Sequence, residues 1–265
     1  MREYTLLAAS AVVSAATNVM GRARRGAPRR ILVIKLDHLG DVITATPALR
    51  AVRDAHPDAE IDLLLAPFVA PLFEGSPLVS RVLVYDAPRY RRGTGEKASL
   101  RSLLHGARYD TIIDLRGDPQ TLWLPFTVGA ARRLDRGTTR MRDWLARRFD
   151  RRRPMRHEVE TNLDVVRPLL PRPVDCAAAR VEVNVPKAAR ESIARRLADV
   201  GISEEEPIVT LHPGAAWRPR AWAPERFAAI ADWIGAHYDA RIVFVGSEGE
   251  RDVEAAVRSH ARGSV

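Results

Sequence analysis

The chain has 265 residues, of which 46% are hydrophobic, values typical of a globular protein with one large or two ordinary domains. It carries 42 Lys plus Arg against 33 Asp plus Glu, a formal net charge of +9 that can attract nucleic acid, an anionic membrane or a phosphorylated substrate. Cys176 is the single cysteine of this sequence, which excludes an intrachain disulfide and a four-cysteine zinc site and suits a reducing cytoplasm.

Residues 1–28 combine an apolar run with a basic stretch. Residues 5–20 are uncharged and rich in Ala and Val, and arginines follow between Arg22 and Arg30. The run is shorter than the roughly 20 residues of a spanning helix and contains several polar side chains. We therefore expect a helix that lies on the protein or on an anionic membrane face. A signal peptide and a membrane-spanning helix are the alternatives.

From Ile31 onward, short apolar runs alternate with amphipathic segments, the pattern of a parallel sheet with helices on its faces. The elements expected in chain order are strand 31–36, helix 42–55, strands 61–65, 81–85 and 111–115, and helix 157–170. Prolines end the last helix, and a linker is expected up to residue 179. Residues 29–172 are predicted to form the first Rossmann-like lobe.

A second round of the same pattern follows. Its expected elements are strand 181–185, helix 188–200, strand 208–212, helix 224–238, strand 241–245 and a helix that starts near residue 250. Residues 180–265 are thus predicted to form a second Rossmann-like lobe. Because a doubly wound lobe needs roughly 120 to 150 residues, we expect this lobe to be incomplete and a C-terminal portion to be missing.

The first motif of chemical interest, KLDHLGDV, follows the first predicted strand at residues 35–42. Ligands of open parallel sheets bind at this carboxyl edge. Gly40 would let the backbone turn tightly near a ligand, and Asp41 falls at the start of the next helix. Asp41 is then either a helix N-cap or a general base that takes a proton from an attacking sugar hydroxyl. Nothing local decides between the two.

The second motif, TLHPGAA, ends a strand of the second lobe at residues 210–216. Gly214, Ala215 and Ala216 leave backbone amides uncovered, and Arg218 and Arg220 follow closely. Amides and guanidinium groups together can neutralise a diphosphate that gains charge as it departs. The alternative is a solvated loop that leads into a helix beginning near Pro224.

Together these segments resemble the heptosyltransferase family, glycosyltransferase family 9. ILVIKLDHLGDVITATPALRAVR, residues 31–53, is similar to its opening signature, and HPGAAWRPRAWAPERF, residues 212–227, to its donor-lobe signature. The resemblance implies a GT-B architecture, with the acceptor on the first lobe, a nucleotide sugar on the second, and inverting, metal-independent transfer. By position, Asp41 matches the family's general base. Arg220 stands where the family usually has a phosphate-binding lysine, which keeps the charge and changes the geometry.

The resemblance extends to residues 243–250, where an acidic residue of the family can meet the nucleotide ribose. Glu250, and next to it Glu248, are the candidates here. The alternative is that these carboxylates only stabilise a helix N-terminus. The family's later Asp-Ser/Thr-Gly-x-x-His signature has no counterpart in this sequence. The chain as given is therefore expected to bind donor poorly or not at all, and to be a glycosyltransferase that could be inactive in this truncated form.

Arginines supply the remaining candidates. The sequence contains no Asp-x-Asp pair, the usual carboxylate clamp for a divalent ion, so no metal site is expected. His157 and Glu158 begin like a zinc-protease helix, but Thr161 stands in place of the second histidine. An anionic acceptor could be received by arginines of first-lobe loops, although solvated surface is the alternative for each: Arg89, Arg91, Arg92 and Arg116.

We therefore expect a cofactor-free enzyme that moves a sugar such as a heptose from a nucleoside-diphosphate sugar such as ADP-heptose. Its acceptor would be an anionic cell-envelope glycan or glycolipid, as in lipopolysaccharide synthesis. It would be cytoplasmic, with peripheral contact at the inner face of the cytoplasmic membrane. The alternative is a noncatalytic or degenerate nucleotide- or anion-binding protein of the same fold. A nucleic-acid binder is less favoured because no reading motif is recognisable.

Overall fold

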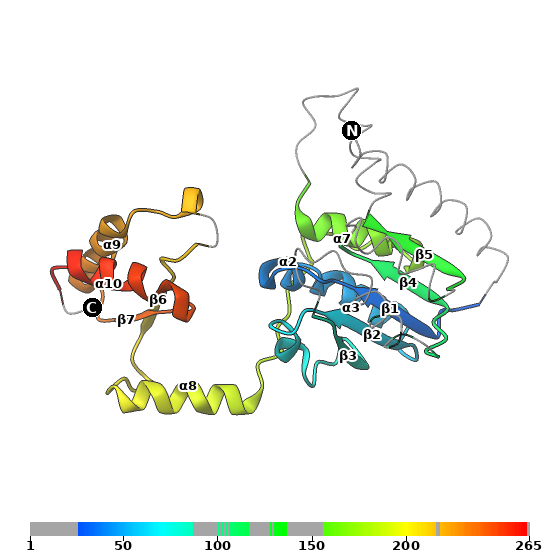
Figure 1. Cartoon of the computed structure of the whole chain (residues 1–265), viewed down its shortest axis with the longest axis horizontal. Coiled ribbons are helices and arrows are strands. Elements are labelled where there is room, and N and C mark those ends of the chain that lie inside the picture. The colour runs from blue at the N-terminus through cyan, green and yellow to red at the C-terminus, as the bar shows by residue number, and fades with distance from the viewer. Residues whose placement is uncertain are drawn as a thin grey trace, which may run out of the picture. The chain divides into compact units, whose positions relative to one another are not determined.

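The computed structural model describes residues 26–86, 106–116, 130–136, 156–215 and 218–263, together with Leu100, Ser102, Leu104 and Val128. The expectations for residues 5–20, for the acceptor arginines Arg89, Arg91 and Arg92, and for Ala216 lie outside these residues. The chain divides into two compact units, the first ending at Pro186 and the second starting at Lys187 (Figure 1).

The first unit is built on a five-stranded sheet in which every strand pairing is parallel. Its strands are β1 (Arg30–Ile34), β2 (Glu60–Leu65), β3 (Arg81–Val84), β4 (Thr111–Asp114) and β5 (Arg132–Asp135), in the order β3-β2-β1-β4-β5. Four of these strands were expected from their apolar runs. β5 was not, because RRLD contains a single apolar residue, and its burial comes from pairing with β4.

Helices cover this sheet: α2 (Leu39–Ile43), α3 (Thr46–Ala55), the 3-10 turn η1 (Ala70–Phe73), and α7 (Glu158–Val166), which runs into η2 (Arg167–Leu169). The single helix predicted over 42–55 is wrong, since the chain turns at Thr44 and Ala45. Pro47 lacks an N–H, and its ring would clash with the Ile43 carbonyl in a continuous helix. That carbonyl instead accepts a hydrogen bond from Thr46 Oγ1 at 2.7 Å.

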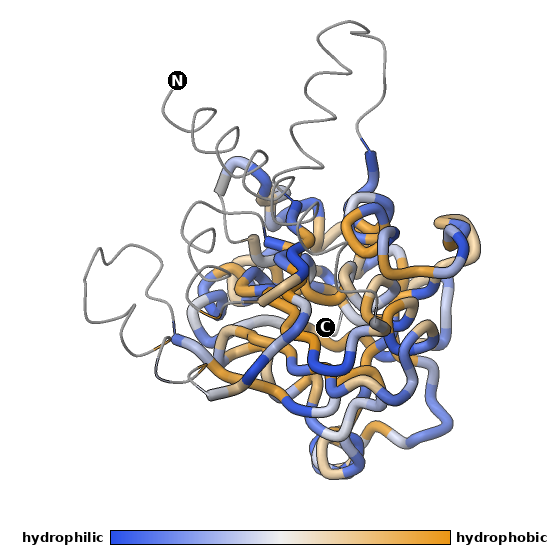
Figure 2. The backbone as a smooth tube through the Cα atoms, turned by 90° about the vertical axis from the view of Figure 1, so that its right-hand side faces the viewer, coloured by the Kyte–Doolittle hydropathy of each residue, from blue (hydrophilic) through white to orange (hydrophobic). Residues whose placement is uncertain are grey.

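Both faces of the sheet are apolar and covered. Ile31 and Val33 of β1 pack into a cluster that includes residues of α3 and α7. Leu32 and Ile34 point to the opposite face, where they meet Leu100 and other buried side chains. Figure 2 shows the alternation of apolar and polar stretches along the backbone that produces these layers.

The strand predicted at 181–185 is absent from the structure, and the segment belongs to the first unit. Its valines, Val181, Val183 and Val185, are exposed, and the residues between them are half-buried. Glu182 donates its N–H to Thr46 Oγ1 at 2.9 Å, and its carboxylate accepts from Arg50 Nε at 2.9 Å and Nη2 at 2.7 Å. Asn184 Nδ2 donates to the Glu74 carbonyl at 2.7 Å. Polar partners on α3 and after η1 thus turn the valines outward.

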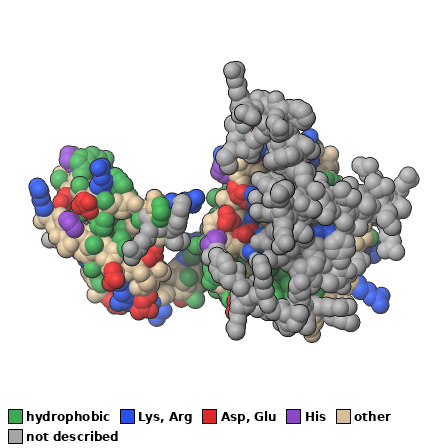
Figure 3. Space-filling view, turned by 45° about the horizontal axis from the view of Figure 1, so that its top comes forward, with side chains coloured by type: hydrophobic (Ala, Val, Ile, Leu, Met, Phe, Trp, Pro, Cys, Tyr) green, Lys and Arg blue, Asp and Glu red, His purple; other side chains and the backbone are tan. Residues whose placement is uncertain are grey.

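The second unit contains α8 (Lys187–Asp199), β6 (Ile208–Leu211), η3 (Arg218–Arg220), α9 (Pro224–His237), β7 (Arg241–Phe244), η4 (Glu248–Glu250) and α10 (Arg251–His260). These elements confirm the order predicted after residue 186. β6 and β7 pair in parallel, and α9 packs against α10 through a small set of buried residues: Ala228, Ala231, Ile234 and Val257. Figure 3 shows hydrophobic side chains on the visible surface of this unit.

Within the described residues, no helix combines the length and the apolar character that crossing a membrane requires.

Candidate active site

The turn after β1 carries Asp41 at the carboxyl edge of the first sheet. His38 is the N-cap of α2, and Asp41 is the third residue of that helix, so the interpretation of Asp41 as the N-cap is wrong. Its side chain is 49% exposed, and Oδ2 lies 3.7 Å from His38 Nδ1. An exposed carboxylate at this edge is accessible to a ligand that approaches the sheet.

Gly40 does not serve the tight turn that was expected of it. It lies inside α2, and its φ is not among the positive values found for glycines of the described chain. A Cβ placed on Gly40 would meet nothing within 4 Å. The surface beside Asp41 is therefore open at this point, which leaves room for an incoming group.

Buried and half-buried charges lie beside this turn. The Lys35 ammonium contacts Asp37 Oδ2 at 3.0 Å and Glu158 Oε1 at 3.4 Å. Arg136 holds the Glu158 carboxylate with a guanidinium fork, and Arg116 donates to the Leu36 carbonyl. Of these residues, only Arg116 was predicted to bind a ligand. Lys35 and Glu158 are 123 residues apart, and Arg116 and Leu36 are 80 apart. The sequence alone therefore does not reveal that these side chains meet.

Arg116, a predicted acceptor-binding residue, lies just after β4. Its backbone N–H donates to Asp114 Oδ1 at 3.0 Å, and its Nε lies 3.8 Å from Asp37 Oδ1. The side chain is mostly buried and takes part in holding the β1 turn. Its contact with an acceptor stays a prediction.

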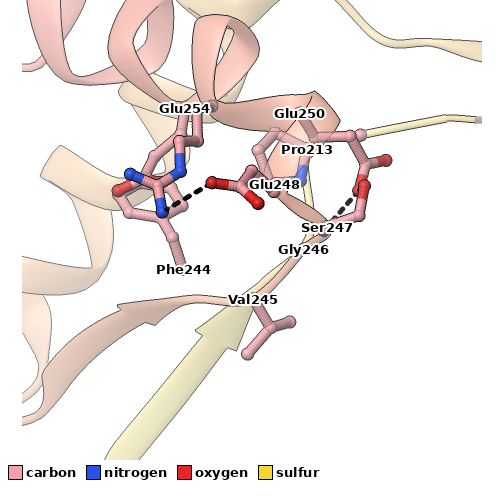
Figure 4. A pocket seen from close by; sticks show the side chains of 10 residues that line it. Pro213, Phe244, Val245, Gly246, Ser247, Glu248, Glu250 and Glu254 are labelled. Carbon is pink, nitrogen blue, oxygen red and sulfur yellow. Dashed lines mark hydrogen bonds and ion pairs between the residues drawn. The ribbon is translucent and has the colours of Figure 1, made fainter.

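In the second unit, a pocket of about 280 Å³ opens at the carboxyl ends of β6 and β7 (Figure 4). It brings together the two turns that follow these strands, and the described residues that line it are Pro213, Gly214, Phe244, Val245, Gly246, Ser247, Glu248, Glu250, Arg251 and Glu254. Three of the predicted donor-site residues, Gly214, Glu248 and Glu250, thus meet in one place. The position follows from the strand pairing, because both turns leave the same edge.

Gly214 and Glu250 fit closely together. A Cβ on Gly214 would lie 1.8 Å from Glu250 Oε1 and 2.3 Å from its Cδ, so any side chain larger than hydrogen displaces the carboxylate. Position 214 therefore requires glycine because the Glu250 carboxylate fills the space that a side chain would take. The sequence suggested a different reason, namely that glycine leaves backbone amides uncovered.

Glu250 closes a capping box with Ser247. Its Oε2 accepts hydrogen bonds from the Ser247 backbone N–H and hydroxyl, both at 2.7 Å, and its Oε1 lies 3.5 Å from His212 Nε2. The bond from the Ser247 backbone is the main cause that lowers the pKa of Glu250 below its usual value. The Ser-x-x-Glu spacing could have indicated this contact from the sequence. Helix capping is thus present here, and nucleotide binding by Glu250 and Glu248 stays a prediction.

The charge of the pocket lining is mainly negative. Glu248, Glu250 and Glu254 contribute carboxylates, and Arg251 lies 3.5 Å from Glu248 Oε1. Such a surface suits hydroxyl or amino groups, which donate hydrogen bonds, better than it suits phosphate. Arg220 ends η3, is exposed, and is not part of the described lining; Ala215 is half-buried in the turn after β6. Binding of a diphosphate by Gly214, Ala215 and Arg220 stays a prediction.

Comparison with solved structures defines the class. The glycosyl transferase family 9 structure from Veillonella parvula DSM 2008 is 22% identical, with a TM-score of 0.73 over 89% of this chain and 67% of that one. Escherichia coli heptosyltransferase WaaC with ADP-2-deoxy-2-fluoro heptose is 21% identical, with a TM-score of 0.57 over 86% of this chain and 72% of that one. The fold is thus α/β of the GT-B type, with Rossmann-like parallel sheets, as expected.

Comparison of sequences then gives the family. A family model described as Glycosyltransferase family 9 (heptosyltransferase) matches residues 97–264, more than half of the chain, and the chain belongs to this family. The match includes residues 212–227 but not 31–53. Lipopolysaccharide heptosyltransferase 3 of Escherichia coli is 24% identical over 231 residues, which are 84% of this chain and 65% of that protein. The chain therefore spans about two thirds of the length of this relative.

Proposed function

We propose that the protein transfers a sugar from a nucleoside-diphosphate sugar to an anionic glycan or glycolipid of the cell envelope. The observation that carries this proposal is the exposed carboxylate of Asp41 at the carboxyl edge of the first sheet, in a chain of the heptosyltransferase family. Relatives named lipopolysaccharide heptosyltransferases support lipopolysaccharide as the acceptor class and heptose as the sugar.

Asp41 acts as the general base in this proposal. An acceptor hydroxyl attacks the anomeric carbon, the bond from that carbon to the diphosphate oxygen breaks, and the hydroxyl proton passes to the carboxylate. A single displacement of this kind inverts the configuration at the anomeric carbon. Because Asp41 is half exposed, acceptor can reach it without rearrangement of the core.

The second unit binds the donor. The carboxylates of Glu248 and Glu250 accept hydrogen bonds from ribose hydroxyls in the pocket. The amides of Gly214, Ala215 and Ala216, together with Arg220, stabilise the departing diphosphate. WaaC has been solved with an ADP-heptose analogue, which supports ADP-heptose as the donor to test first.

Two further parts of the proposal rest on charge. Arginine takes the place of a divalent ion at the diphosphate, so transfer is expected to continue in the presence of a chelator such as EDTA. The acceptor's anionic groups meet Arg116 and the predicted loop arginines. The basic stretch after residue 20 would keep the enzyme at the cytoplasmic face of an anionic membrane.

The decisive experiment is the Asp41→Asn variant, assayed for heptose transfer from ADP-heptose and for ADP binding. Transfer should fall about 10²- to 10⁴-fold, the contribution of a general base, while ADP affinity stays unchanged. Asp54→Asn is the matched control, because Asp54 is also an exposed carboxylate, lies on α3 of the same unit, and pairs with Arg50. Normal transfer by Asp41→Asn would rule out the base; ADP binding without transfer in the unaltered protein would favour a noncatalytic role.

A further inference from the structure

A buried ammonium lies directly before the turn that carries Asp41. Lys35 follows β1 and is 1% exposed. A charge in the interior persists where it is paired and where its N–H groups have acceptors. The lysine has three such groups, and three oxygens surround it: Asp37 Oδ2 at 3.0 Å, the Leu115 carbonyl at 3.2 Å and Glu158 Oε1 at 3.4 Å. Its hydrogen-bonding capacity is used within the unit, which argues against contact with substrate.

Glu158 is shared by two cations from different strands. It is the first residue of α7, and Arg136, which follows β5, binds it through Nη1 at Oε1 and through Nη2 at Oε2, the latter at 2.5 Å. Burial raises the pKa of Glu158, but Arg136 and Lys35 outweigh burial and hold the pKa below its usual value. The carboxylate therefore stays ionised and joins the ends of β1 and β5 to the start of α7.

The residues between Lys35 and α2 are held from a second side. Arg116, after β4, donates to the Leu36 carbonyl, and its Nε lies 3.8 Å from Asp37 Oδ1. Asp37 thus lies between Lys35 and Arg116. His38, the next residue, is the N-cap of α2, and Asp41 follows within the first turn of that helix.

We propose that Glu158 is a positioning residue for the Asp41 turn, acting through Lys35 and Asp37. The inference rests on the proposed function in one respect, the role of Asp41 as base. Lys35 and Arg136 both contact Glu158 Oε1, so without the negative charge two cations would face each other at short range. Lys35 would then move toward solvent, and Asp37, which is bound to it, would move with it.

A purely neutralising role for Glu158 makes a different prediction. Loss of the carboxylate would then lower the stability of the whole unit and leave the local opening of residues 37–43 unchanged. Local exchange and the kinetics of transfer separate the two roles, because neither responds to a uniform loss of stability in the native range.

The test compares Glu158→Gln with Glu160→Gln by hydrogen–deuterium exchange of the full chain. Glu160 is the matched control, since it lies in the same helix turn and binds an arginine, Arg156, at 2.8 Å, without contacting Lys35 in the described structure. In Glu158→Gln, the amides of residues 37–43 should exchange about tenfold faster than in the unaltered protein, the effect of losing one charge-assisted hydrogen bond. In Glu160→Gln, the same amides should exchange at the rate of the unaltered protein. Equal exchange in the two variants would overturn the proposal.

Transfer kinetics supply the second measurement. In Glu158→Gln, kcat should fall about tenfold, and KM for the nucleotide sugar should stay unchanged because the proposed donor pocket lies in the other unit. Faster exchange with an unchanged kcat would show that the turn moves without consequence and would also overturn the proposal. If the unaltered protein transfers no sugar, the proposed function fails, and the exchange measurement still tests the positioning contact.

Asp37→Asn keeps the proposal testable if Glu158→Gln does not fold. It breaks the link between Lys35 and the turn and leaves the Lys35–Glu158 and Arg136–Glu158 contacts in place. Faster exchange confined to residues 37–43, with α7 unchanged, is the expected result. Unchanged exchange in this variant would contradict positioning through Asp37.

Discussion

Two glycines of the second unit meet different surroundings. A methyl group on Gly214 would overlap the Glu250 carboxylate, whereas one on Gly235, inside α9, would meet nothing within 4 Å. Gly214 is required because a larger residue would clash with the Glu250 carboxylate of the capping box. Gly235 is a helix residue that has no such steric constraint in the described structure.

Gly214→Ala should therefore weaken nucleotide binding and lower stability. Displaced by the methyl group, Glu250 loses its bonds to the Ser247 backbone and hydroxyl, so the helix start loses its cap and the unfolding temperature should fall. Gly235→Ala, the control, should stabilise the protein by about 0.5 to 1 kcal/mol, because alanine loses less entropy in a helix. Thermal unfolding and calorimetric titration with ADP measure both effects; equal unfolding temperatures for the two variants would contradict the packing argument.

Single residues of the site differ in how well the sequence reveals them. Asp41 could be found because its motif follows a strand and precedes a helix, and the Ser247–Glu250 capping box has a local spacing. Glu158 could not be identified, because its partner Lys35 is 123 residues away and only the fold brings them together. Interactions between residues close in sequence can thus be predicted from the sequence, whereas charge pairs between distant residues cannot.

At the scale of elements, the segment 180–186 is the main departure from expectation. The alternating valines favour a strand by periodicity alone. In the structure, Thr46 and Arg50 of α3 bind Glu182, so the polar residue faces the unit and the valines face outward. The strands and helices with continuous apolar faces were predicted correctly. β5 and the break before α3 were missed because one depends on a neighbouring strand and the other on a single proline.

Glu182→Gln should release this segment from α3. The Arg50 fork lowers the pKa of Glu182, but both side chains are about one third exposed, so solvent screening limits the loss of unfolding free energy to about 0.5 to 1 kcal/mol. Proteolysis after Arg180 should become several-fold faster, since release exposes the backbone there. Glu191→Gln, which removes an exposed pair with Lys187, is the control and should leave cleavage unchanged. Equal cleavage rates in both variants would show that Glu182 does not anchor the segment.

At the scale of the whole molecule, acid should weaken the first unit through Glu158. Its pKa is lower in the folded than in the unfolded chain, so its contribution to stability is complete above the unfolded pKa of about 4.3 and is lost as pH falls through the folded value. The stability difference between the unaltered protein and Glu158→Gln should therefore shrink below pH 4.5 or so. Denaturant unfolding at pH 7 and at pH 3.5 measures it; a constant difference would contradict the ionised state inferred for Glu158.

The two units also differ in how much apolar surface they bury. Most of the buried hydrophobic residues of the described chain lie on the five-stranded sheet and its helices, whereas α8 buries none and the second unit buries Ala228, Ala231, Ile234 and Val257. Because apolar burial contributes roughly 25 cal/mol per Å², β6 and β7 should open more readily than β1 and β2.

Native-state hydrogen exchange should show amides of 208–211 and 241–244 exchanging at least tenfold faster than those of 31–34 and 61–65. ADP should slow exchange at 208–211 and 241–244 alone, since the proposed nucleotide pocket lies at the ends of those strands. Equal protection of the two sheets without nucleotide would contradict the dependence of local stability on the buried core.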